Sequence, residues 1–280
     1  MAHPTLERAR LREFLKTEDL YVYTVNAFPY GPFKRRRGME DVYEPDWSTD
    51  DRVRYTCDVA DVLANMVEDG ISPTIQSAPL AFRPKVSGPS DVAALTHNLF
   101  RVVTHLIQLE RTTGTRVKLA LEPEPFCFLE TTQETVDYFN THVYSVAGTR
   151  ALVEMTGQPA SEVFTDTIYL SQTTQLRDGV TTKFLNLIDA IAAWKASPGG
   201  DCEWRTHFHV PVFSRRTRVV SDDQGIAAAL RVHAQAPVSD HLEIETYTWD
   251  VLPAHLKAGD ITDYVVRELE WVRDELGAGK

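Results

Sequence analysis

The chain has 280 residues, of which 43% are hydrophobic and 25% charged, the proportions of a globular protein and not of a disordered one. That length accommodates one large α/β barrel or two small domains. The formal net charge of −11 disfavours nucleic acid as a general partner, because an acidic surface repels a polyanion.

Three local features bear on partners and location. The one basic run, Lys34–Arg37, is either a solvated loop or a contact for a phosphate or carboxylate. The cysteines (Cys57, Cys127 and Cys202) are widely spaced and form no CxxC pair, which favours reduced thiols. The first residues lack the apolar run of a signal peptide, and no apolar run has the length of a membrane span. We therefore expect a cytoplasmic protein with no membrane span.

Short apolar strands followed by amphipathic helices recur along the chain, which predicts a parallel sheet in an α/β fold. The predicted strands are Leu20–Phe28, Pro73–Leu80, Val117–Glu122, Thr206–Phe213 and His241–Tyr247, with a weaker one at Thr167–Leu170. The predicted helices include one near Asp91, one begun by the capping box of Thr131 and Glu134, one around Phe184–Trp194, and one at about Ile261–Leu276. Six strands are fewer than the eight of a closed barrel. We therefore predict an incomplete TIM-barrel-like (β/α)8 fold, with residues 1–280 as a single domain.

Two glutamates lie at the end of the third predicted strand. The sequence there is Leu121-Glu122-Pro123-Glu124-Pro125, so the strand ends in carboxylates and is broken by prolines. In parallel α/β folds, ligands bind at the carboxyl ends of the strands. Glu122 and Glu124 are therefore candidate site residues, with a solvated loop as the alternative.

A pair of histidines occupies the predicted strand Thr206–Phe213. His207 and His209 are two residues apart, so strand alternation points both imidazoles to one side and Phe208 to the other. Buried imidazoles need a partner, which a metal ion or a substrate hydroxyl would supply. The alternative is a hydrogen-bonded pair in the core.

The last predicted strand repeats this spacing with carboxylates, because Glu243 and Glu245 fall on one side of it. Acidic residues on a buried strand are rare unless they are paired or bound to metal. Glutamate and histidine side chains from three strand ends would give a ligand set for Mg²⁺, Mn²⁺ or Zn²⁺. Such an ion polarises a carbonyl and its adjacent hydroxyl, while a free carboxylate moves a proton between neighbouring carbons.

The stretch from Asn26 to Phe33 is rich in aromatic residues, proline and glycine, and it follows the first predicted strand. Its aromatic rings would either stack on a sugar ring or pack as a lid over the protein interior. Motifs of other chemistries are absent from the chain, because it has no G-x-S-x-G elbow, no P-loop and no G-x-G-x-x-G.

Five segments carry a family resemblance: Tyr23–Phe33, Asp41–Trp47, Leu119–Pro125, His207–Phe213 and Leu242–Pro253. Together they resemble the EboE-type metabolite traffic proteins, which belong to the xylose-isomerase-like (sugar phosphate isomerase/epimerase) superfamily of TIM barrels. The resemblance spans about Leu20 to Leu276. The segments LEIETYTWDVLP and HFHVPVF carry it most specifically.

The resemblance implies a divalent-metal barrel that acts on a small polyol, cyclitol or sugar, or its phosphate, in secondary-metabolite production or export. By strand position, Glu122, His209 and Glu245 match the metal ligands of the superfamily. Glu122, Glu245 and His207 are the candidate catalytic residues. The candidate substrate-binding residues are Asn26, Phe28, Tyr30, Glu124, Glu243 and Trp249.

The chain also departs from the family pattern. The family has a further strand unit before Leu20, and it has two strands between LEPEP and HFHVP, one of which supplies another metal ligand. Nothing in Val153–Asp178 matches those two strands, and we interpret this as an internal deletion. Two functions stay open, a metal-dependent isomerase or epimerase and a catalytically impaired barrel that serves as a binding or scaffold protein. Exposed strand edges of an incomplete barrel favour cover by another chain, as in a homo-oligomer.

Overall fold

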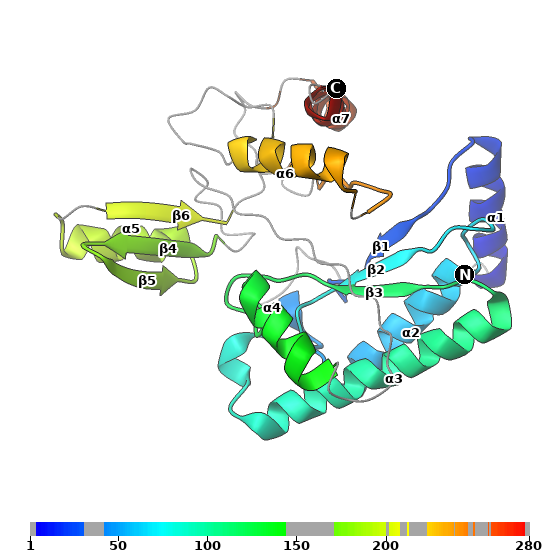
Figure 1. Cartoon of the computed structure of the whole chain (residues 1–280), viewed down its shortest axis with the longest axis horizontal. Helices are drawn as coiled ribbons and strands as arrows, with labels where there is room; N and C mark the ends of the chain where they lie inside the picture. Colours follow the sequence, from blue (N-terminus) through cyan, green and yellow to red (C-terminus); the bar gives the residue numbers. More distant parts are fainter. Residues whose placement is uncertain are drawn as a thin grey trace. The chain divides into compact units, whose positions relative to one another are not determined.

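The computed structural model describes residues 4–30, 42–143, 171–199, 202–207, 212, 223–237, 239–245, 249, 257 and 259–277 (Figure 1). The chain divides into two compact units, Met1–Gly157 and Gln158–Lys280. Its described part is mixed α/β, with one parallel and one antiparallel sheet of three strands each. None of the described helices is long and apolar enough to cross a membrane. The described strands close no barrel. Residues 144–170 lie outside the described ranges, and they include most of Val153–Asp178, where we predict missing strands, and the weaker predicted strand Thr167–Leu170.

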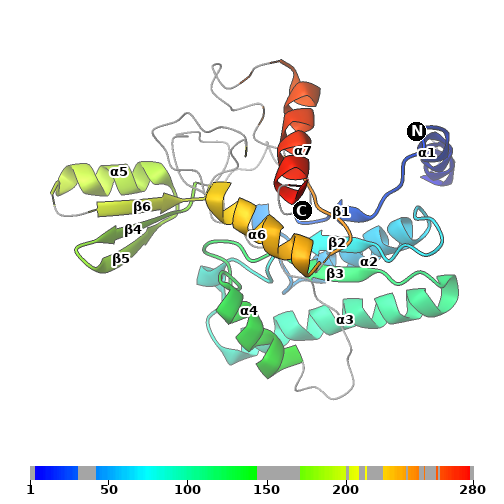
Figure 2. The ribbon, with the colours of Figure 1, turned by 45° about the horizontal axis from the view of Figure 1, so that its top comes forward.

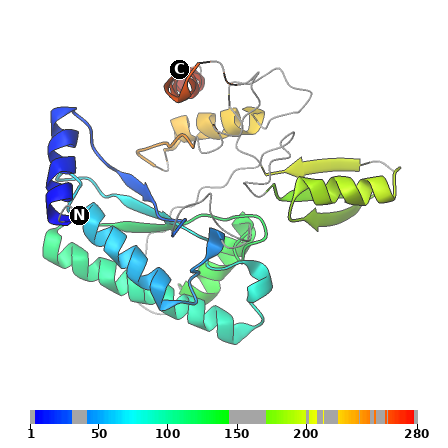
Figure 3. The same ribbon diagram turned by 180° about the vertical axis from the view of Figure 1, so that it is seen from behind.

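The first unit is built on the parallel sheet β1-β2-β3, and α2 and α3 lie on one face of it (Figures 1 and 3). Its elements are α1 (Pro4–Thr17), β1 (Thr24–Asn26), α2 (Asp50–Ala64), β2 (Thr74–Ser77), the 3₁₀ turn η3 (Arg83–Lys85), α3 (Pro89–Thr113), β3 (Lys118–Leu121), α4 (Thr132–Tyr138) and the π-helical turn η4 (Phe139–Val143). Neighbouring strands pair in parallel, and a helix runs between each pair. The first three predicted strands are therefore confirmed, each as a shorter strand.

The two faces of this sheet differ in chemistry. Ile75, Leu119 and Leu121 point to the helix-covered face and belong to the hydrophobic core with residues of α2 and α3. Strand alternation puts the residues between them on the opposite face. That face is polar and half-buried, and it carries Thr24, Asn26, Thr74, Gln76, Lys118 and Glu122.

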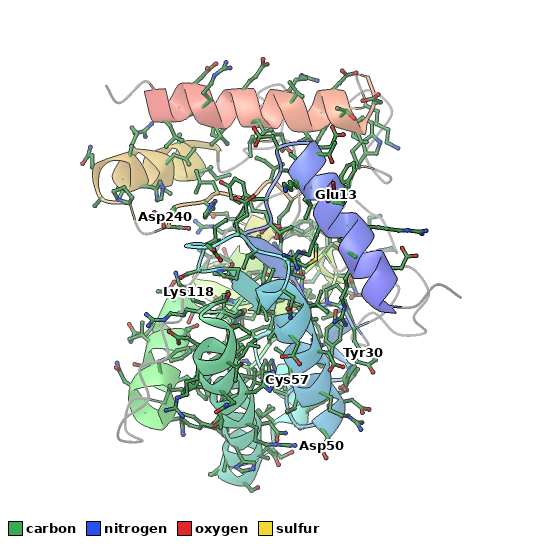
Figure 4. The ribbon with its side chains drawn as sticks, turned by 90° about the vertical axis from the view of Figure 1, so that its right-hand side faces the viewer. Glu13, Tyr30, Asp50, Cys57, Lys118 and Asp240 are labelled. Atoms are coloured by element: carbon green, nitrogen blue, oxygen red, sulfur yellow. The ribbon has the colours of Figure 1, made fainter. Side chains whose placement is uncertain are left out.

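The helices of the first unit begin where side chains satisfy their first N–H groups. The Thr49 side chain accepts from Arg52 N at the start of α2, and Asp50 and Cys57 follow along that helix (Figure 4). The predicted capping box is confirmed, because Thr131 accepts from Glu134 N while the Glu134 carboxylate accepts from Thr131 N. Helix α3 instead has Pro89 in its first turn, so it begins two residues before Asp91.

A buried arginine joins the start of α2 to the carboxyl end of β1. The Arg52 side chain is 0% exposed, and its guanidinium donates to the carbonyl oxygens of Pro45, Ala27 and Phe28 at 2.7, 2.8 and 3.0 Å. Backbone carbonyls are strong acceptors that must be paired when buried. Arg52 therefore fixes both the loop after β1 and the segment that precedes α2.

The carboxyl end of β2 is held in a similar way by Trp47. Its indole N–H donates to Ala78 O at 3.0 Å, and its backbone N–H donates to Leu80 O at 3.0 Å. Its own carbonyl accepts from the Asn98 side chain of α3 at 2.9 Å. The loops at this edge of the sheet are therefore positioned by hydrogen bonds with α2, with α3 and with the segment before α2.

The second unit contains the antiparallel sheet β5-β4-β6, with α5 against it (Figure 2). Its elements are β4 (Thr173–Arg177), β5 (Val180–Phe184), α5 (Leu187–Ala196), β6 (Cys202–Thr206), α6 (Asp223–Gln235) and α7 (Ile261–Gly277). Helix α7 confirms the last predicted helix. Helix α5 covers the later part of the predicted stripe Phe184–Trp194.

The second unit departs from our predicted strands. Thr206 is the last residue of β6, which pairs antiparallel with β4, so the described start of the strand predicted at Thr206–Phe213 belongs to an antiparallel sheet. His207 follows β6 and Val212 lies in a turn, while residues 208–211 and 213 lie outside the described ranges. Of the predicted strand His241–Tyr247, the described residues His241–Glu245 form no strand, and residues 246 and 247 lie outside the described ranges. Ser239 Oγ donates to His241 O and accepts from His241 N, so the backbone of His241 is held in a local turn. The hairpin β4–β5 was not predicted, although Asp178 and Gly179, both at positive φ, form the two-residue turn that favours it.

Replacement of Arg52 by methionine should destabilise the first unit by about 3–5 kcal/mol, because three carbonyl acceptors lose their donor. Urea denaturation followed by circular dichroism measures the change. Arg54→Met is the matched control, since Arg54 is exposed on the same helix and pairs with Asp51. A loss under about 1 kcal/mol is expected there. Equal losses in the two variants would contradict the role of Arg52.

Candidate functional site

Polar side chains meet at the carboxyl edge of β1-β2-β3, on the face that α2 and α3 do not cover. Asn26 and Gln76 pair in register on adjacent strands, and Glu122 directly follows β3. The Gln76 side-chain amide donates to the Glu122 carboxylate. The Glu122 backbone N–H donates to Ser77 O at 3.0 Å, so both ends of this residue are fixed by β2. Glu122 is half-buried and oriented at the edge where parallel sheets bind ligands.

Glu124 lies beside a buried aromatic cluster. The hydroxyl of Tyr43 donates to Glu124 Oε1 in a long contact of 3.5 Å. The Tyr43 ring stacks on Phe82, with centroids 5.6 Å apart, and meets Phe28 at 5.7 Å. A rotamer fixed by ring packing holds its hydroxyl in one place. Tyr43 therefore orients the second carboxylate, a role that sequence spacing did not indicate.

Three candidate residues, Asn26, Phe28 and Tyr30, lie at or after the end of β1, and their environments differ. Asn26 Oδ1 accepts from Phe28 N at 3.0 Å, which closes a local turn. Phe28 is 8% exposed and lies inside the aromatic cluster, so it packs in the protein interior and is not open for stacking on a sugar. Tyr30 is 46% exposed, and its ring meets Tyr55 edge-on at 5.1 Å. Of the two aromatic candidates, Tyr30 is the one with a ring open to solvent.

The remaining candidate ligands belong to the second unit. His207 follows β6, and its ring Nδ1 lies 3.2 Å from Gln172 Oε1 while its backbone N–H donates to Gln172 O at 2.8 Å. A ring oriented through one nitrogen is typical of metal-binding histidines and of hydrogen-bonded core histidines. His209 lies outside the described residues. Partial burial and the negative charge of Glu245 raise the pKa of Glu243.

The predicted metal set is not completed within the described part of the chain. There, no group of three or more His, Cys, Asp or Glu side chains is close enough to hold a metal ion. Glu122 offers a hard oxygen donor of the type that Mg²⁺ and Mn²⁺ prefer. Glu122 belongs to the first unit and Glu245 to the second. The set of Glu122, His209 and Glu245 therefore stays a prediction.

A buried carboxylate that sequence reasoning missed lies on α7. Glu268 is 4% exposed, and burial raises its pKa to about 7, although Val212 N donates to its Oε1 at 3.4 Å and acts in the opposite direction. Tyr264 lies one turn earlier and packs edge-on against the predicted site residue Trp249, with ring centroids 5.1 Å apart. The signal was the position of Glu268 on the stripe of α7 that otherwise carries apolar residues.

Comparison of the chain with protein-family models, curated proteins and solved structures found no match.

Glu268→Gln should remove part of the pH dependence of stability. A glutamate whose folded-state pKa is about 7, against an ordinary 4.5, binds its proton more tightly when folded. The loss of stability caused by burying the charged carboxylate is therefore absent below pH 4.5, grows as pH rises, and is complete above pH 7. The variant should gain on the order of 2 kcal/mol at pH 8 and nothing at pH 4.

Urea midpoints of both proteins between pH 4 and 8 measure this difference. Glu270→Gln is the control, because Glu270 is exposed on the same helix. A pH-independent difference between the wild type and Glu268→Gln would show that the carboxyl is not penalised by burial.

Proposed function

We propose that the chain binds a small polyol, cyclitol or sugar at the carboxyl edge of β1-β2-β3, in the manner of a sugar phosphate isomerase/epimerase-type barrel protein. The observation that carries the proposal is the Glu122–Gln76 pair on the polar sheet face. Carboxylate and amide groups bind hydroxyls as acceptors and donors. Ligand sites combine a few such fixed polar groups with aromatic surfaces, and Tyr30 supplies an exposed ring on the loop after β1.

The resemblance to EboE-type metabolite traffic proteins supports the same ligand class and adds a divalent metal ion. In this proposal, Glu122 contributes one ligand to the ion, and the sequence-derived set adds His209 and Glu245. An ion bound to a sugar would polarise its carbonyl and adjacent hydroxyl. Proton transfer between neighbouring carbons is the step that an isomerase or epimerase needs, and a carboxylate that does not bind the ion would perform it as a general base.

Glu122→Gln should abolish stabilisation by Mn²⁺ and by myo-inositol, because the amide lacks the charge that the ion needs. The wild type should gain about 2.7 kcal/mol at a ligand concentration of about a hundred times Kd. Thermal melts of the full chain with MnCl₂, with myo-inositol and with both measure the effect. Glu110→Gln is the control, because Glu110 pairs with Arg116 near the start of β3 and should leave every shift unchanged.

The remaining outcomes separate the two functions. A melting temperature unmoved by millimolar Mn²⁺, Mg²⁺ and Zn²⁺ would exclude the metal-dependent enzyme, and a shift with myo-inositol alone would then support the binding-protein alternative. Glu245→Gln tests the sequence-derived ligand set, since loss of Mn²⁺ binding is expected there too. If none of these ligands moves the melting temperature, the proposed function is wrong.

A further inference from the structure

Strand β6 forms an outer edge of the antiparallel sheet. It lies at one end of the order β5-β4-β6, and in the described part of the chain no strand pairs with its outer side (Figures 1 and 3). Helix α5 packs mainly on β4 and β5. The edge of a sheet presents backbone N–H and C=O groups that can pair with another chain. The edge of β6 is therefore a candidate surface for strand pairing.

The hydrogen bonds between β4 and β6 show which residues of β6 face outward. His207 N donates to Gln172 O at 2.8 Å, directly beyond the paired stretch. Such bonds alternate along an antiparallel pair. The backbone groups of Glu203 and Arg205 therefore point to β4, and those of Trp204 point away from the sheet.

Two tryptophans lie at this edge, on the side of the sheet that carries α5. Trp204 is half-buried, and its ring meets the Trp194 ring of α5 edge-on, with centroids 6.4 Å apart. Trp194 is 39% exposed. Tryptophan is enriched among the residues that contribute most of the binding energy at protein interfaces. A strand placed beside β6 would bury more of both rings.

The other face of the same edge carries one charge of each sign. Alternation puts Glu203 and Arg205 on the face opposite Trp204, and Arg205 Nε lies 2.7 Å from Glu203 Oε1. Their side chains are 57% and 77% exposed. In an antiparallel pair of β6 strands with Trp204 on the two-fold axis, each Glu203 lies opposite the other copy's Arg205. An axis through Glu203 or Arg205 would place like charges opposite each other, which is unfavourable. The charges of β6 therefore favour a single register.

We propose that a second copy of this chain pairs antiparallel with the edge of β6, with Trp204 on the two-fold axis. Each Trp204 then donates its backbone N–H to the other copy's Trp204 and accepts from it. The two indole rings lie side by side on one face, and the two ion pairs form on the other. Thr206 is buried within its own unit, so the contact centres on Glu203–Arg205. The inference does not depend on the proposed function, because none of these residues belongs to the Glu122 site.

Sedimentation equilibrium of the full chain over a range of protein concentrations tests this contact. The wild type should form a dimer. Glu203→Arg and Arg205→Glu each place like charges across the axis, so association should weaken about 10-fold or more. Trp194→Ser should weaken it about 10–30-fold. Lys183→Glu is the matched control, because it reverses an exposed charge on β5 at the opposite edge of the sheet and should leave association unchanged. Circular dichroism checks that each variant is folded.

Mixing the two charge variants separates a contact between copies from a role within one chain. The Glu203→Arg chain carries two positive charges at this edge, and the Arg205→Glu chain carries two negative ones. A mixed dimer has opposite charges at both positions, so mixing should restore association. An ion pair that acts only within one chain would not be restored in this way. A monomeric wild type, a dimer that the single variants leave unchanged, or a loss that mixing does not rescue would each overturn the inference.

Discussion

The buried guanidinium of Arg52 determines how the carboxyl edge of the parallel sheet is arranged. A buried arginine is stable only when its N–H groups are paired, and here three carbonyl oxygens from two segments accept from it. These carbonyls lie on the loop after β1 and on the segment before α2. Because one planar group contacts both, the positions of Ala27 and Pro45 are linked to the first turn of α2. The loop that Arg52 fixes begins at Asn26, so Arg52 also helps to fix this end of the candidate site.

Strand alternation explains why one short sheet provides both a core and a site. Ile75 and Leu121 bury their side chains against the helices, and the residues between them necessarily face the other way. On that side, polar residues are tolerated because they pair with each other, as Gln76 does with Glu122. A shift of one residue in register would place the carboxylate in the hydrophobic core. The core therefore fixes the direction in which Glu122 points.

The sequence predicted those elements whose signals come from residues close together in the chain. The T-x-x-E box gave the start of α4, and apolar periodicity gave α3, α7 and the strands β1–β3, although the predicted strand bounds were too long. Alternation misled us at His241–Glu245, which form no strand, and Ser239 Oγ instead satisfies the backbone N–H and carbonyl of His241. The burial of Arg52 was beyond such signals, because charged residues on amphipathic helices normally face solvent. Glu268 lies on the apolar stripe of α7, which is a signal of burial, but only the packing of distant segments decides whether such a carboxylate is buried.

The carboxylates of Glu122 and Glu268 have different surroundings. These surroundings limit which partners each carboxylate can bind. The Glu122 carboxylate accepts from the Gln76 side-chain amide and lies at an edge of the sheet, so it is oriented toward a ligand. Among the described residues, Glu268 Oε2 has no hydrogen-bond partner, and burial raises the pKa of Glu268 to about 7. A carboxylate of the first kind suits the binding of a cation or a hydroxyl. One of the second kind gains from any partner that completes its hydrogen bonds, since binding then removes a penalty that the folded chain already carries.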